Sequence, residues 1–312
     1  MMSNRWSKGR LGLAAGALAL VFGLAVSAAN AAEPESVTFT VTATAKKGSD
    51  VPAVRTGDVQ FFLDKKSTPV SEWKRGEKLY LAVLIDDSLD SNVANQWSEV
   101  RAFFNAMPPT TYISVFYNRN GTAMLAQDFT NDHALAGKAL RIPLGNEGTF
   151  SSPYLAVQDL LKRWPATSPE DRGSILMISS GIDYFRGNFT PITPDMDETV
   201  ALAQKHNINV WSIYEPDAMH RSRGLFLSFR GQMNLSELAE ETGAESYYLN
   251  ATPLVSFKPY LDELLAHLNN QYLLTFEGNG GSKGRFERVH ETTELSNTEL
   301  FSASQAFLPA QK

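Results

Sequence analysis

The sequence contains no cysteine in its 312 residues. It therefore forms no disulfide, offers no thiolate to a metal, has no cysteine nucleophile and carries no lipid-modified cysteine at a mature N-terminus. A chain of this length has enough residues to bury a sizeable core without such cross-links. We therefore expect a globular protein that is stabilised by its core alone.

Basic residues are in the minority, with 28 Lys and Arg against 34 Asp and Glu, which gives a formal net charge of −6. An acidic chain is a poor electrostatic match for nucleic acid and for anionic membrane surfaces. We expect neither as a partner.

Several motifs that mark enzymes or cofactor sites are also missing. No Gly-x-Gly-x-x-Gly or Gly-x-x-x-x-Gly-Lys loop follows a predicted strand, so we expect no bound nucleotide. No Gly-x-Ser-x-Gly elbow presents a serine nucleophile. The histidines show no ligand spacing such as His-x-x-x-His, so zinc is not expected. They are His133, His206, His220, His267 and His290.

The first 32 residues are predicted to be a signal peptide. Three basic residues precede an uncharged run rich in Ala, Leu and Gly at 11–26, and small residues suited to cleavage follow at 29–31. The alternative is an uncleaved anchor, because the run is nearly long enough to span a bilayer. Its weak hydrophobicity favours cleavage. We expect an exported protein, periplasmic or secreted, with no membrane span after cleavage.

From residue 79 onward, predicted strands and helices alternate, which indicates an α/β fold with a doubly wound, mostly parallel sheet. The run at 79–85 is apolar without a polar face, as in a strand covered on both sides. Short β segments flank this region, and because they need partners we expect them to pair in a small β module. The expected organisation is a signal peptide at 1–32, an N-terminal β segment at 33–77, the α/β domain at 78–276 and a C-terminal β segment at 277–312 that packs with the first.

An oxygen-rich turn follows the apolar run, with Asp86, Asp87, Ser88, Asp90 and Ser91 in succession. It lies at the carboxyl end of a strand, where open α/β sheets place their ligands. Carboxylates about 4 Å apart repel by about 1 kcal/mol per pair in water and roughly 4 kcal/mol at an effective dielectric of about 20. Solvent, helix N-terminal amides or a hard cation must offset this repulsion.

Five sequence features in a fixed order resemble the von Willebrand factor type A (VWA) domain, and more narrowly the exported bacterial group of VWA-related proteins. The resemblance covers roughly residues 79–276 and implies a Rossmann-like fold that recognises proteins without catalysis. The features are Asp86-x-Ser88-x-Asp90 after a strand, Gly148-Thr149 before a helix, Ser180-Gly181 after a strand, Thr242-Gly243-Ala244, and Gln-Tyr-Leu-Leu-Thr-Phe at 271–276.

The resemblance also implies a metal-ion-dependent adhesion site, in which oxygen ligands hold Mg²⁺ or Mn²⁺ and a carboxylate of a partner protein completes the shell. Carried over, the ligands are Asp86, Ser88, Asp90, Thr149 and Ser180, with Asp183 near the rim.

Two of these positions depart from the family pattern, because Asp90 stands where the family has Ser and Ser180 where it has Asp. One hypothesis is that Asp90 supplies the missing charge. The alternative is a degenerate site in which Asp90 or Ser91 only caps the following helix, predicted at 91–106.

A second candidate region is the segment 215–233, predicted to be a loop over the same edge, with a capping box at Asn234 opening the next helix. One interpretation is a surface excursion that buries its own aromatic residues. The other is a partner-binding lip, since Arg and aromatic residues are common interface anchors. Its expected contact residues are His220, Arg221, Arg223 and Phe226.

Three functions therefore follow as hypotheses. The first is recognition of a protein at a divalent-cation site. The second is a structural or assembly protein with a metal-free site that binds through 215–233. The third is a hydrolase that uses Asp86, Asp183 and a metal.

Overall fold

The computed structural model of the protein describes residues 35–48, 50–145, 152–185, 194–218, 225–249 and 252–310. All of these lie in one unit, Glu33–Lys312. The predicted signal peptide at 1–32 lies outside the described residues, as do Thr149, His220, Arg221 and Arg223.

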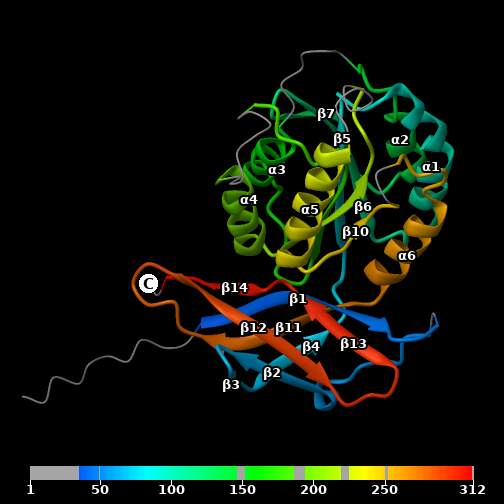
Figure 1. Ribbon diagram of the computed structural model, residues 1–312. Coiled ribbons are helices and arrows are strands. Elements are labelled where there is room, and N and C mark those ends of the chain that lie inside the picture. The colour runs from blue at the N-terminus through cyan, green and yellow to red at the C-terminus, as the bar shows by residue number, and fades with distance from the viewer. Residues whose placement is uncertain are drawn as a thin grey trace, which may run out of the picture. The chain divides into compact units, whose positions relative to one another are not determined.

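The central sheet has six strands in the order β10-β9-β8-β5-β6-β7 (Figure 1). β7 is antiparallel to β6, and the other neighbours are parallel. Numbered along the chain, this is the 3-2-1-4-5-6 order of doubly wound sheets. The predicted fold class is therefore confirmed. The strands are β5 (Leu79–Asp86), β6 (Thr111–Arg119), β7 (Thr122–Thr130), β8 (Arg172–Ser179), β9 (Ile208–Tyr214) and β10 (Ser246–Tyr247).

Helices cover both faces of this sheet, with α1, α2 and α6 on one side and α3, α4 and α5 on the other (Figure 1). β5 lies between the layers and points Val83 and Ile85 into one core and Ala82 and Leu84 into the other. This explains its lack of a polar face. The helices are α1 (Trp97–Ala106), α2 (His133–Lys138), α3 (Pro153–Lys162), α4 (Pro194–Lys205), α5 (Leu225–Glu241) and α6 (Lys258–Asn269).

Two predicted helices begin elsewhere. The helix expected at 91–106 starts with a 3₁₀ segment, η2 (Ser91–Gln96), before α1. The prediction of a loop at 215–233 is wrong for its second half, because α5 begins at Leu225. The capping box predicted at Asn234 therefore falls inside that helix. The helix was missed because apolar residues occupy its exposed face as well as its buried one, which hides the period of 3.6 residues.

The remaining strands form two small sheets, in the orders β13-β1-β11-β4 and β14-β12-β2-β3. β1 pairs with β13, and β2 pairs with β12, so segments from both ends of the chain lie side by side. The strands are β1 (Glu35–Ala45), β2 (Val59–Leu63), β3 (Lys66–Ser67), β4 (Val70–Lys74), β11 (Gln271–Gly278), β12 (Arg285–Thr293), β13 (Thr298–Ser302) and β14 (Gln305–Leu308).

The two small sheets share an apolar core. The rings of Phe39, Phe61 and Phe276 meet in it, with centroids 4.8 to 6.0 Å apart. The segment 271–276, assigned from the sequence to the α/β domain, instead pairs with β1 and β4 as an inner strand of this module. The segment is buried on both faces, a pattern that fits an inner strand of the β module as well as a strand of the central sheet.

The β module adjoins the amino ends of the parallel strands, away from the oxygen-rich turn. The backbone N–H of Thr40 donates to Asn207, which precedes β9, at 2.8 Å. Arg172, at the start of β8, donates to the side-chain oxygen of Gln271, the first residue of β11, at 3.4 Å. Burial lowers the pKa of Arg172 to about 10, and the nearby charge of Arg75 adds to the effect. The carboxyl ends of the strands are left clear of the module.

Candidate functional site

Asp86 is the last residue of β5, and its carboxylate is buried between two neighbouring strand ends. Asn118, its register partner on β6, donates to one carboxylate oxygen, and Ser179, the last residue of β8, donates to the other. Parallel strands end at the same edge of a sheet, so the topology itself collects these groups. The carboxylate is held in one orientation by residues that the sequence analysis did not single out.

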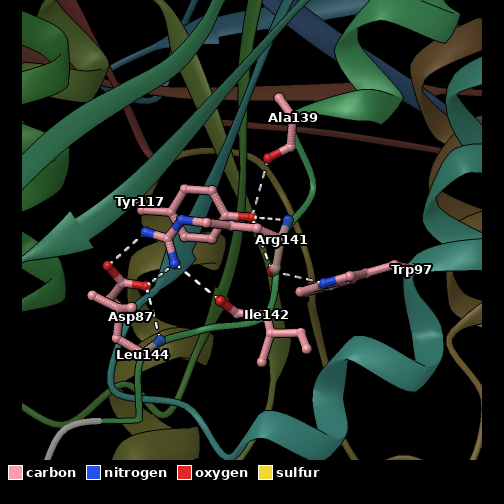
Figure 2. A network of polar contacts seen from close by, with 7 residues as sticks. All are labelled: Asp87, Trp97, Tyr117, Ala139, Arg141, Ile142 and Leu144. Carbon is pink, nitrogen blue, oxygen red and sulfur yellow. Dashed lines mark hydrogen bonds and ion pairs between the residues drawn. The ribbon is translucent and has the colours of Figure 1, made fainter.

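Asp87 is neutralised by Arg141, as Figure 2 shows. The guanidinium donates to both carboxylate oxygens at 2.6 and 2.7 Å, and it stacks 3.7 Å from the centre of the Tyr117 ring. The hydrogen bond to Asp87 raises the pKa of Arg141. The Leu144 N–H adds a third bond to Asp87 at 3.2 Å. Much of the repulsion expected in the acidic turn is therefore offset by an arginine.

Ser88 lies two residues after Asp86, with a buried hydroxyl that has no hydrogen-bond partner among the described residues. Its backbone is fixed, because its carbonyl accepts from the Ala218 N–H at 3.1 Å. A buried polar group without a partner costs roughly 1 to 3 kcal/mol. The Ser88 hydroxyl is therefore the one orphaned oxygen in the described part of this turn, and a cation would satisfy it.

Asp90 caps the 3₁₀ segment η2, accepting from the Asn92 N–H at 2.9 Å. The capping bond expected of Asp90 is therefore present, and a role for Asp90 at a cation stays a prediction. Asp90 also lines a cavity of about 460 Å³ together with Glu215. Burial and the charge of Asp90 together raise the pKa of Glu215 to about 7, although the hydrogen bond from the Leu254 N–H opposes them.

Ser180 and Asp183, expected to lie together in the third loop, bind different partners. The Ser180 hydroxyl lies 3.5 Å from a carboxylate oxygen of Asp217, which also accepts from Tyr184. Asp183 accepts from the Ser152 hydroxyl and from the Phe185 N–H, both at 2.9 Å. Asp183 is therefore directed towards the start of α3, and Ser180 towards β9.

Asp217 is the residue that the sequence analysis missed. It is 1% exposed and forms an isolated bridge with Leu89, so it lies against the Ser88–Asp90 turn. Asp217 follows β9 just as Asp86 ends β5. Because open α/β sheets bind ligands at the carboxyl ends of their strands, this position in the sequence could have identified Asp217. The carboxylate beside Ser180 thus comes from the segment after β9.

The described residues bring together at this edge a carboxylate from Asp86, an orphaned hydroxyl from Ser88, and the Ser180–Asp217 pair. One carboxylate with hydroxyl oxygens and water is a donor set that suits Mg²⁺ or Mn²⁺. Phe226, the described member of the expected partner-binding set, is 69% exposed on α5. Whether the edge holds a metal stays a prediction.

The chain matches no protein-family model and no curated protein sequence. It is similar to solved structures of an aerotolerance-related membrane protein from Bacteroides fragilis (11% identity, TM-score 0.44, 61% of this chain and 98% of that one) and of BatB from Bacteroides thetaiotaomicron (11% identity, TM-score 0.44, 62% and 98%). It is also similar to the SpRpn10 VWA domain (14% identity, TM-score 0.37, 60% and 95%).

These likenesses concern the fold alone. The strand order, the antiparallel edge strand and the helices on both faces follow from the coordinates of this chain. None of the helices described is long and apolar enough to cross a bilayer. On the order and direction of its strands, the protein has a von Willebrand factor type A-like fold.

Proposed function

We propose that the protein recognises another protein at the carboxyl edge of its central sheet, through a divalent cation held by Asp86 and Ser88. The observation that carries this proposal is the buried Ser88 hydroxyl, which has no hydrogen-bond partner in the described part of the chain and lies two residues after a buried carboxylate. Mg²⁺ or Mn²⁺ would satisfy both groups and leave positions for water and for a partner's carboxylate.

The charges around the turn support one cation there. Arg141 neutralises Asp87, and the Asp86 carboxylate is buried beside it at the end of β5. Asp90 caps η2, so we propose Asp217 instead of Asp90 as the source of the carboxylate that the third loop lacks. Thr149 remains a proposed ligand from outside the described residues.

We propose a role without catalysis. A hydrolase that used Asp86 and Asp183 together would need both carboxylates at one reacting group. Asp86 is bound by Asn118 and Ser179, and Asp183 is bound by Ser152 at the start of another helix. Turnover of an ester or phosphoester in a substrate screen, lost in Asp86→Ala, would contradict this part of the proposal.

We also propose export to the periplasm or medium, on the basis of the signal-peptide pattern at 1–32. Mass spectrometry of the protein recovered from the envelope and from the medium tests this directly. A mature N-terminus near residue 32 is expected, and an intact Met1 in the cytoplasmic fraction would contradict it.

Isothermal titration with MgCl₂ and MnCl₂ tests the cation site. We expect one cation per chain at this edge of the sheet, with binding at this site lost in Asp86→Ala and weakened roughly tenfold or more in Ser88→Ala. Ser114→Ala is the matched control, because Ser114 also has a buried hydroxyl without a partner among the described residues, but within β6. Equal binding by wild type and Asp86→Ala would reject the site.

A second candidate function is metal-free assembly through α5. Its first half exposes Leu225, Phe226, Phe229 and Met233 by 50 to 69%. Phe226, Phe229 and Met233 are spaced three and four residues apart, so they share one face of the helix. Cross-linking in the native envelope, with and without EDTA, separates the two candidates. The double variant Phe226→Ser/Phe229→Ser loses capture under both conditions if α5 binds alone, and Leu125→Ser on β7 is the exposed control.

A further inference from the structure

Three side chains that commonly bind metals meet at the other end of the central sheet. They are Glu245, which precedes β10, and Glu263 and His267 on α6. One ligand atom from each lies within 4.8 Å of the other two, and no second group of three His, Asp or Glu in the described ranges meets this condition. Glu263 and His267 are four residues apart, so they project from the same face of α6. The helix geometry thus places two of the three ligands.

His267 is held in one orientation. Its ring is 5% exposed and stacks on Trp211, with centroids 5.5 Å apart. Nε2 lies 3.4 Å from the Thr44 hydroxyl, and Nδ1 lies 3.7 Å from a carboxylate oxygen of Glu245. A metal-binding histidine usually donates its second ring N–H to an oxygen, which fixes its tautomer. Thr44 is positioned to accept that bond, which leaves the Nδ1 lone pair directed towards the carboxylates.

An ordinary ion pair does not account for the cluster. The contact between His267 Nδ1 and Glu245 is long for an ion pair, at 3.7 Å. Glu245 and Glu263 are two acids, each with a carboxylate oxygen within 4.8 Å of the other and of the imidazole. The Tyr247 hydroxyl, 3.4 Å from Nδ1, is a distant and uncharged partner. The cluster thus has two acids, one imidazole and no lysine or arginine.

We propose that Glu245, Glu263 and His267 bind a divalent transition-metal cation, with Zn²⁺ as the best match. Zn²⁺ accepts imidazole nitrogen and carboxylate oxygen at distances of about 2.0 to 2.2 Å, and three protein ligands leave one position for water. Mg²⁺ and Ca²⁺ prefer sets made of oxygen alone. The site is separate from the one at Asp86. It departs from the expectation from the sequence, which rested on the lack of paired histidines at ligand spacing.

The position of the site indicates a structural role. Thr44 belongs to β1, and Phe301 of β13 packs its ring edge-on against His267 at 5.7 Å. The cation would join α6 to the segment before β10 where both meet the β module. Metal binding to the folded state alone stabilises that state. We therefore expect Zn²⁺ to strengthen the attachment of the β module.

Zinc titration of the purified full chain, after treatment with a chelator, tests the proposal. ZnCl₂ is added to the wild type and to Asp86→Ala, which keeps the two cation sites distinguishable. We expect one zinc per chain at this cluster in both proteins. Glu245→Gln and Glu263→Gln should each weaken zinc binding at the cluster roughly tenfold or more. Asp262→Asn is the matched control, since Asp262 neighbours Glu263 on α6 but pairs with Lys258.

Thermal unfolding with and without ZnCl₂ gives a second readout. Glu263 is exposed, so Glu263→Gln keeps the fold and changes the ligand set alone. We expect zinc to raise the Tm of the wild type and of Asp262→Asn but not of Glu263→Gln. The proposal is overturned if Asp86→Ala binds no zinc, or if Glu245→Gln and Glu263→Gln bind it as tightly as the wild type does.

Discussion

Arg141 binds both carboxylate oxygens of Asp87, although 54 residues separate them in the chain. Asp87 is 3% exposed and Arg141 42% exposed, so the acid is buried while its partner reaches solvent. The pair attaches the segment after α2 to the turn after β5 (Figure 2).

Arg141→Lys should destabilise the protein by about 2 kcal/mol. The lysine keeps the charge but loses the two-point contact with Asp87 and the stacking on Tyr117, leaving a buried carboxylate poorly satisfied. Urea unfolding measures the change. Arg163→Lys is the control, because Arg163 pairs with Asp159 at the surface, where such contacts contribute up to about 1 kcal/mol. Equal losses of unfolding free energy in Arg141→Lys and Arg163→Lys would contradict the prediction that the buried Asp87 makes its ion pair the more stabilising one.

Gly231→Ala should destabilise the protein by roughly 1 to 3 kcal/mol, although alanine is the better helix former by up to about 1 kcal/mol. A Cβ at Gly231 would lie 2.0 Å from the carbonyl oxygen of Ser180, so α5 would have to move away from the third loop. Thermal unfolding measures the loss. In Gly137→Ala the new methyl group meets only the flexible Arg101 side chain, at 3.2 Å, and we expect no loss of Tm there.

The features that sequence could predict are those with a local pattern. Residues 79–85 of β5 have no polar face, and this apolar run alone placed the strand inside a covered sheet. Ser152 followed by Pro153 predicted the start of α3, and the structure has Ser152 as the N-cap with proline in the first turn. Gly243 ends α5 with a φ of 71°, as expected of a capping glycine.

The features that sequence could not predict depend on distant residues. Nothing near Asp87 indicates Arg141, because the pairing arises only when the segment after α2 folds back over β6. The ligand atoms of Glu245 and His267 meet only once α6 has packed beside β10. The exposed apolar face of α5 was misleading, since Phe226 and Phe229 resemble core residues but face solvent.

Asp217→Asn should weaken Mg²⁺ binding roughly tenfold or more, whereas Asp90→Asn should leave it nearly unchanged. Asp217 is the carboxylate beside Ser180, while Asp90 caps η2, and asparagine caps a helix as well as aspartate does. Isothermal titration compares the two variants. A larger loss in Asp90→Asn would instead support the hypothesis that Asp90 supplies the charge missing from the third loop.

Glu291→Gln should stabilise the protein at pH 8 and have little effect at pH 4. Glu291 is 5% exposed in the β module and accepts from the Ser302 hydroxyl at 3.0 Å. Burial raises its pKa from 4.5 to about 7, so the folded state holds the proton more tightly than the unfolded state does. Stability should therefore fall as the pH rises from about 4.5 to about 7.

The loss of folding stability cannot exceed the free energy that corresponds to the rise in the pKa of Glu291. The rise from 4.5 to about 7, at 1.36 kcal/mol for each pKa unit, gives on the order of 3 kcal/mol. Urea unfolding of wild type and Glu291→Gln between pH 4 and pH 8 measures the difference. Glu299→Gln, at an exposed position of β13, is the control and should follow the wild-type curve. If the gap between wild type and Glu291→Gln does not widen as the pH rises, Glu291 does not carry the buried charge that its surroundings indicate.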